Sequence, residues 1–148
     1  MIENSYVMVK PEFADIPEVI AEVKRRLMDA GMKIVEEQYI NYAVEDARKH
    51  YSSYLDEAWY PPLEAYITGG KAYGMVVQGE NAITTIRALT GATKNPAPGT
   101  IRYDIPTALG LEIRVRENVI HSSDSPEAAQ KESDIFRSIC AKNNSAQL

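Results

Sequence analysis

Apolar residues recur along the chain with two different spacings, and together they predict alternating strands and helices. Short apolar runs are typical of buried strands, whereas apolar residues that recur every three or four positions indicate one buried helix face. Gly31 and Gly91 follow two of the helical patterns and suit helix ends. The predicted strands cover 6–9, 34–40, 72–77 and 119–121, and the predicted helices cover 15–30, 81–89 and 126–139, with short broken helices over 44–67.

Four further stretches add detail to this pattern. Asp15 and Glu18 resemble a capping box at the start of the first helix. Residues 93–102 are rich in proline and glycine and predict a loop, and residues 111–115 alternate like a small extra strand or hairpin. Residues 141–148 are polar, and we expect them to form a disordered tail.

The order of these elements predicts the fold class. It is best matched by an α+β (α/β-sandwich) fold with a ferredoxin-like βαββαβ core, a four-stranded antiparallel sheet and added short helices. No internal repeat or low-complexity linker divides the sequence, so we expect a single domain over residues 1–140.

Composition and charge narrow the class of protein. Of 148 residues, 45% are apolar and 25% are charged, as in ordinary globular domains. The formal net charge of −5 argues against a general nucleic-acid binder, although a few local cations can still hold a nucleotide. The one cysteine, Cys140, cannot form an intrachain disulfide, no apolar run is long enough to span a membrane, and residues 1–10 lack the layout of a signal peptide. We therefore expect a cytoplasmic protein without a nucleic-acid or membrane partner.

His121 is the strongest candidate for chemistry in the sequence. It ends a short apolar run, and a helix start follows, with Ser125 suited to the cap and Pro126 to the first turn. Glu132 falls on the inward stripe of that helix, where a carboxylate needs a partner. A carboxylate that holds one imidazole nitrogen leaves the other free to attack. Two alternatives stay open: a purely structural His–Glu pair, or a glutamate tilted towards solvent.

Several cations and hydroxyls suit a phosphate ligand if they converge on one cleft. Lys10 ends the first predicted strand, Arg87 lies on a helix, and Arg102 follows the proline-rich loop with Thr93 nearby. Taken singly, each arginine is more typical of a solvated surface. Trp59 can stack on a nucleobase, but core packing explains it as well.

Other phosphate and metal motifs are missing from the sequence. It contains neither a P-loop nor a G-x-G-x-x-G segment. His50, His121 and Cys140 lack metal-ligand spacing, so no protein-ligated zinc site is expected. His50 lies in a charged segment and is predicted to be a surface residue.

Taken together, these segments resemble the nucleoside diphosphate kinase family over about Ser5 to Phe136. Six motifs carry the resemblance, in the order in which the family has them. They are Val7-Met8-Val9-Lys10-Pro11, Gly79-Glu80-Asn81-Ala82, Gly91-Ala92-Thr93, Asn95-Pro96-Ala97, Pro98-Gly99-Thr100-Ile101-Arg102 and Asn118-Val119-Ile120-His121.

The resemblance implies a ping-pong transfer of the γ-phosphate of a nucleoside triphosphate such as ATP to a nucleoside diphosphate, through a phosphohistidine at His121. It implies a catalytic group in which Glu132 orients the histidine, Ser123 lies near that glutamate and Lys10 lies near the transferred phosphate. The nucleotide-binding residues that it implies are Lys10 and Asn118 for the ribose, Tyr51, Arg87, Thr93 and Arg102 for the phosphates, and Trp59, Leu63 and Val115 for the base.

The resemblance also implies a cofactor and an assembly. Mg²⁺ is held mainly by the nucleotide phosphates and water, without a dedicated carboxylate cage. Family members are homo-oligomers, so a hexamer is expected, with a tetramer or dimer as the alternatives.

Several positions depart from the family pattern. The usual Lys-Pro-Asp-Gly is Lys10-Pro11-Glu12-Phe13, and glycines are replaced by Ser122 and Tyr103. The loss of glycine beside His121 predicts a restricted backbone or a narrower approach to the phosphate. The 94–98 loop is shortened, which bears on assembly, and extra residues lie between 105 and 118. These changes leave an alternative: a catalytically weakened relative that acts as an oligomeric nucleotide-binding or interaction module.

Overall fold

The computed structural model describes residues 1–146 and contains one four-stranded antiparallel sheet. The strands are β1 (Ile2–Val9), β2 (Lys33–Ile40), β3 (Ala72–Glu80) and β4 (Ile120–Ser122), in the order β2-β3-β1-β4. The main helices are α1 (Pro17–Asp29), α2 (Val44–His50), α3 (Tyr60–Ile67), α4 (Ala82–Thr90), α5 (Ile101–Ala108) and α6 (Pro126–Ala146). The predicted ferredoxin-like α+β class is confirmed.

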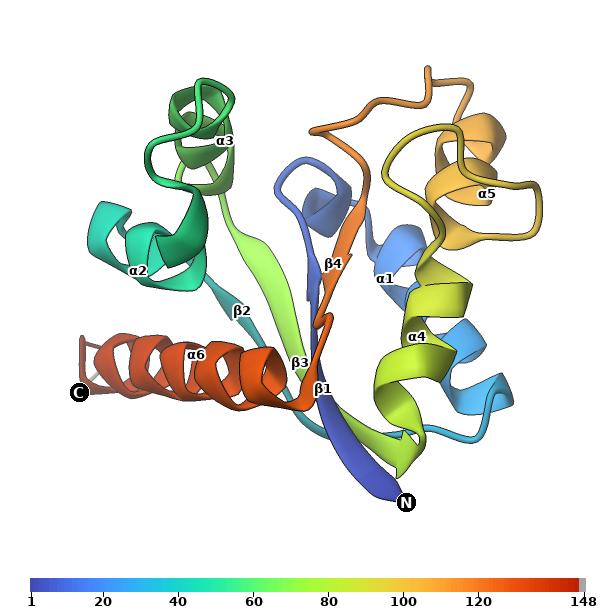
Figure 1. Ribbon diagram of the computed structural model, residues 1–148, viewed down its shortest axis with the longest axis horizontal. Coiled ribbons are helices and arrows are strands. Elements are labelled where there is room, and N and C mark those ends of the chain that lie inside the picture. Colours follow the sequence, from blue (N-terminus) through green and yellow to red (C-terminus); the bar gives the residue numbers. More distant parts are fainter. Residues whose placement is uncertain (147–148) are drawn as a thin grey trace.

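Helices cover both faces of the sheet (Figure 1). One face packs against α1, α4 and α5, and the other packs against α2, α3 and α6. Side chains alternate across a strand. Val7 and Val9 of β1 therefore enter the first core, whereas Tyr6 and Met8 enter the second.

The start of α1 differs from the prediction. Asp15 belongs to a short 3₁₀ turn, η1 (Phe13–Asp15), and the residue that precedes the helix is Ile16, which makes no side-chain cap hydrogen bond. The backbone N–H groups of Val19 and Ile20 instead donate to the Ile16 carbonyl. The predicted capping box is therefore wrong, because the 3₁₀ turn already orders the chain into the helix.

Helix α5 was not predicted, and its first two residues fall in the stretch 93–102 that was predicted to be a loop. Pro106 lies inside the helix, where it removes a backbone hydrogen bond. The helix forms because Ile101 and Ile105 bury their side chains in the core beside α4, and such packing overrides local propensity.

Two predictions about irregular segments are wrong. Residues 111–115 lie in the described part of the chain and form neither a strand nor a hairpin; they run exposed between α5 and β4. The predicted disordered tail continues α6 as helix as far as Ala146, and residues 147–148 lie outside the described residues. No helix within residues 1–146 is both long and apolar enough to cross a membrane.

Candidate active site

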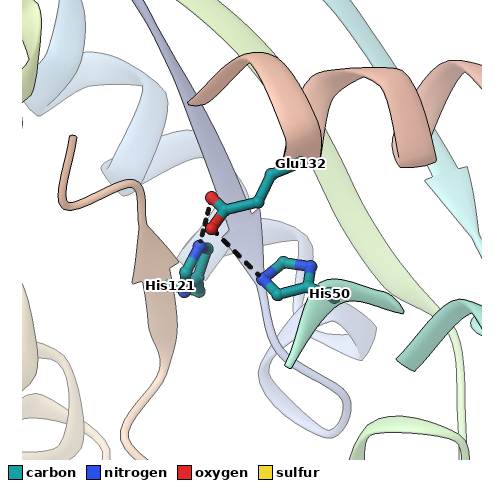
Figure 2. A group of neighbouring side chains, drawn as sticks. All are labelled: His50, His121 and Glu132. Carbon is teal, nitrogen blue, oxygen red and sulfur yellow. Dashed lines mark hydrogen bonds and ion pairs between the residues drawn. The ribbon is translucent and has the colours of Figure 1, made fainter. Parts of the chain in front are cut away.

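His121 lies in the middle of β4, opposite Met8 of β1. Strand alternation directs both side chains towards α6, and the His121 side chain is 18% exposed. Its Nε2 lies 2.8 Å from Oε1 of Glu132 (Figure 2). A carboxylate only accepts, so Nε2 carries the proton and Nδ1 keeps its lone pair. The arrangement leaves a nucleophilic nitrogen free.

Glu132 approaches from the second turn of α6, whose start is capped as predicted. The Ala128 N–H donates to Ser125 Oγ at 3.0 Å. Glu132 is buried, so a glutamate tilted towards solvent is excluded. Its Oε1 also accepts from Ser123 Oγ at 2.7 Å, and that hydroxyl accepts from the Tyr6 N–H at 2.9 Å. These donors offset the cost of burying the carboxylate.

A cavity of about 480 Å³ opens in front of His121. Trp59 and Val115, 49% and 53% exposed, lie on its rim. Its described lining contains four cationic side chains and no carboxylate, so it suits an anion despite the acidic net charge of the chain. The lining residues are Lys10, Tyr51, Trp59, Leu63, Thr93, Lys94, Arg102, Val115, Arg116, Asn118 and His121.

Lys10 and Arg102 are two cations of the cavity whose pKa values are lowered by burial. The Lys10 ammonium donates to Asn118 Oδ1 at 2.6 Å, and burial followed by the charge of Arg102 lowers its pKa to about 7. Burial, followed by the charge of Arg87, lowers the pKa of Arg102 to about 10, so this guanidinium stays charged at neutral pH. A bound phosphate would compensate both desolvated cations.

Most of the predicted binding residues meet in this cavity. The exception is Arg87, which lies exposed on α4 and does not line the cavity, although it is near enough to affect Arg102. Ser123 and Glu132 lie behind His121 rather than in the lining. Two lining cations, Lys94 and Arg116, were not predicted, because both belong to segments where the sequence departs from the family motifs.

His50 was predicted to be a surface residue, and this prediction is wrong. Its side chain is 1% exposed, and its ring meets the His121 ring edge-on with 4.6 Å between centroids. The inward face of α2 contains Asp46, Ala47 and His50, so a spacing of three and four residues was a signal that the surrounding charges obscured. His50, His121 and Glu132 bring three ligand-type atoms within 4.8 Å of one another.

Comparisons with known proteins agree with this geometry. A family model described as nucleoside diphosphate kinase matches residues 3–139. The chain belongs to the nucleoside diphosphate kinase family. It is therefore a nucleotide-binding phosphotransferase.

Individual relatives are similar over nearly the whole chain. A nucleoside diphosphate kinase of Archaeoglobus fulgidus is 42% identical over 91% of this chain and 86% of its own length. One of Listeria monocytogenes is 38% identical, with coverages of 91% and 88%. The solved structure of a Halobacterium salinarum nucleoside diphosphate kinase in complex with CDP is 32% identical, with a TM-score of 0.82 over 92% of this chain and 88% of that one.

Two positions where the nucleoside diphosphate kinase pattern has glycine, Ser122 and Tyr103, lie outside the lining of the cavity. Ser122 faces the opposite side of the sheet from His121, and its Oγ lies 3.0 Å from Thr90 Oγ1. Within residues 1–146, the non-glycine residues with positive φ are Glu12, Asn81, Asn95 and Val119, so neither Ser122 nor Tyr103 needs glycine geometry. The backbone of β4 therefore accommodates a serine beside His121 without strain.

Proposed function

We propose that this enzyme transfers the γ-phosphate of ATP to a nucleoside diphosphate through a phosphohistidine on Nδ1 of His121. The observation that carries the proposal is the free Nδ1 at the wall of a cationic cavity, with Nε2 held by Glu132. Nδ1 attacks the γ-phosphorus, an N–P bond forms, and the bond to the β-phosphate oxygen breaks to release ADP. A β-phosphate oxygen of the acceptor diphosphate then attacks the same phosphorus, breaks the N–P bond and leaves as the triphosphate.

The remaining cavity residues fit the two ends of a nucleotide. Trp59, Leu63 and Val115 offer apolar surface to a base, and such contacts hold any base alike. Lys10 and Asn118, already hydrogen bonded to each other, would meet the ribose hydroxyls. Tyr51, Thr93 and Arg102 would meet the phosphates, with Arg87 supplying charge from outside the lining. The Halobacterium salinarum relative was solved in complex with CDP, which supports a nucleotide as the ligand of this chain.

Mg²⁺ fits this site as a partner of the nucleotide rather than of the protein. The described lining offers amide and hydroxyl oxygens but no carboxylate, so the phosphates and water would supply the ligands. When bound, the ion neutralises phosphate charge and helps to place the γ-phosphate in line with His121. We also propose a cytoplasmic homo-oligomer, with a hexamer expected and a tetramer or dimer if the shortened 94–98 loop weakens trimer contacts.

The decisive test is phosphoryl transfer to the protein itself. Incubation with γ-labelled ATP and Mg²⁺ should give a phosphoprotein that is labile in acid and stable in base, and peptide mapping should place the label on His121. His121→Ala should lose the label while still binding ADP. Label that survives this substitution would exclude His121 as the nucleophile. Nucleotide binding without any labelling of the wild-type chain would favour an interaction module instead.

A further inference from the structure

His50 is enclosed by aromatic side chains beside the nucleophile. Its ring stacks on Tyr51 with 4.5 Å between centroids and meets Tyr6, Tyr42 and His121 edge-on. A buried polar atom without a partner is costly. Within residues 1–146, His50 Nε2 is buried and has no hydrogen-bond partner. This orphaned nitrogen needs an explanation.

The groups beside the two ring nitrogens of His50 differ in what they can donate and accept. Tyr42 Oη lies 3.5 Å from His50 Nδ1 and 2.7 Å from Tyr6 Oη. Burial raises the pKa of both phenols, so both hydroxyls keep their protons. Burial lowers the pKa of His50 well below its usual value, so the ring is neutral. The Tyr42 hydroxyl can donate to Nδ1 or accept from it, whereas the carboxylate beside Nε2 only accepts, so the proton belongs on Nε2.

That Nε2–H points to the one carboxylate oxygen that the nucleophile does not use. Oε1 of Glu132 receives both His121 and Ser123, whereas Oε2 lies 3.8 Å from His50 Nε2 (Figure 2). This separation is too long for a hydrogen bond in the free enzyme. Catalytic hydrogen bonds are often long before the substrate binds and shorten in the reacting complex.

We propose that His50 is a positioning residue for the nucleophile: its Nε2–H holds Oε2 of Glu132 while Oε1 holds His121. A carboxylate held at both oxygens cannot rotate about its last bond, so the His121 ring keeps one plane and one tautomer. Fixing the carboxylate matters most when Nδ1 bonds to phosphorus. The His121 ring then becomes cationic, and the negative charge of the fixed carboxylate stabilises it. This inference rests on the proposed role of His121 as the nucleophile.

A pair of His50 variants separates the N–H from the shape of the ring. The amide nitrogen of His50→Gln can occupy the place of Nε2, whereas His50→Phe keeps an aromatic ring but offers no donor. We expect single-turnover phosphorylation of His121 to slow by about 10-fold in His50→Phe, with the affinity for ADP unchanged, and by less than about threefold in His50→Gln. Tyr42→Phe, which removes the hydroxyl facing Nδ1, should give an intermediate rate. Tyr73→Phe, in a tyrosine remote from this network, serves as the matched control and should match the wild type.

Two kinetic outcomes would overturn the inference. Equal slowing of His50→Gln and His50→Phe would show that the packing of the ring, rather than its N–H, affects the rate. A wild-type rate in His50→Phe would show that His50 does not position the nucleophile. If His50→Phe fails to fold, ¹⁵N-histidine spectra of the wild type still decide, since His50 must be the neutral Nε2–H tautomer, and an Nδ1–H tautomer contradicts the inference. A wild-type chain that labels no histidine contradicts the proposed function instead, whatever the tautomer of His50.

Discussion

The two faces of the sheet are built from different kinds of side chain. The face under α1, α4 and α5 is packed mainly with aliphatic residues such as Val7, Leu27 and Val77. The face under α2, α3 and α6 adds buried tyrosines, both histidines of the chain and Glu132. Because side chains alternate along β1 and β4, the same two strands serve both faces. The first face is an apolar core alone, whereas the second combines an apolar core with the candidate chemistry.

One substitution on each face tests whether the chemistry is confined to the face under α2, α3 and α6. Glu132→Gln keeps the volume but removes the charge that orients His121, so phosphorylation should slow by about 10- to 100-fold with little change in unfolding free energy. Leu27→Ala, on the other face, should cost about 2–5 kcal/mol of stability because its side chain is fully buried.

Single-turnover kinetics and denaturant unfolding measure the two effects separately. Leu27→Ala protein that remains folded should phosphorylate His121 at close to the wild-type rate. A 10-fold slower rate in that variant would show that the two faces are coupled rather than divided.

Lys10 directly follows β1 and lines the cavity. Its charge therefore links the stability of the fold to the binding of a phosphate. Its pKa is lowered from 10.5 to about 7, so between those values the unfolded chain binds a proton that the folded chain lacks. This contribution therefore makes stability rise as pH rises from about 7 to 10.5, and Lys10→Met should flatten that rise. A bound phosphate should restore the charge, so ADP binding at pH 8 should take up protons.

Titration calorimetry in buffers of different ionisation enthalpy measures this proton uptake. Lys10→Met provides the reference, since any uptake by the nucleotide itself remains in that variant. Equal uptake by both proteins would show that Lys10 is already charged in the free enzyme.

Ser122 gives the smallest expected effect on activity. It neighbours His121 in sequence but faces α4, so Ser122→Gly should leave the phosphorylation rate within about twofold. The lost contact with Thr90 and the added backbone freedom should cost about 1–2 kcal/mol of stability. A large change in rate, checked by the same single-turnover measurement, would mean that the residue after the histidine limits access to the phosphate.

The sequence was sufficient to predict the four strands, the helices α1, α4 and α6 and the short helices of residues 44–67, whereas the set of residues that meet in the cavity was implied by the family resemblance. Periodic patterns and motif spacings are local, and local signals survive without knowledge of the fold. Helix α5 was missed because the burial of Ile101 and Ile105 depends on α4, which is adjacent only in space. The extra strand predicted over 111–115 was wrong because alternation alone does not provide a partner strand.

Within the site, too, residues were placed correctly where a local pattern indicated burial and misplaced where burial depends on distant parts of the chain. Glu132 was found from its position on a helical stripe, since the stripe records which face is buried. His50 was misplaced because its neighbours in sequence are charged, while its neighbours in space, Tyr6 and His121, come from distant strands. Arg87 was expected beside the phosphate ligands, but its motif position did not predict that it would lie outside the lining.

The contacts of Lys10 with the start of β4 have a consequence for how this chain tolerates length changes. The Lys10 N–H donates to the Val119 carbonyl at 2.8 Å, and its ammonium donates to Asn118 Oδ1 at 2.6 Å. A slip of one residue between β1 and β4 would exchange His121 with Ser122 and point the nucleophile into the aliphatic core. Both contacts are to residues that follow the exposed 109–114 segment, so we expect residues gained or lost within 109–114 to leave the histidine in register. The tolerance should end abruptly at Asn118, where a single deletion would exchange the two faces of β4.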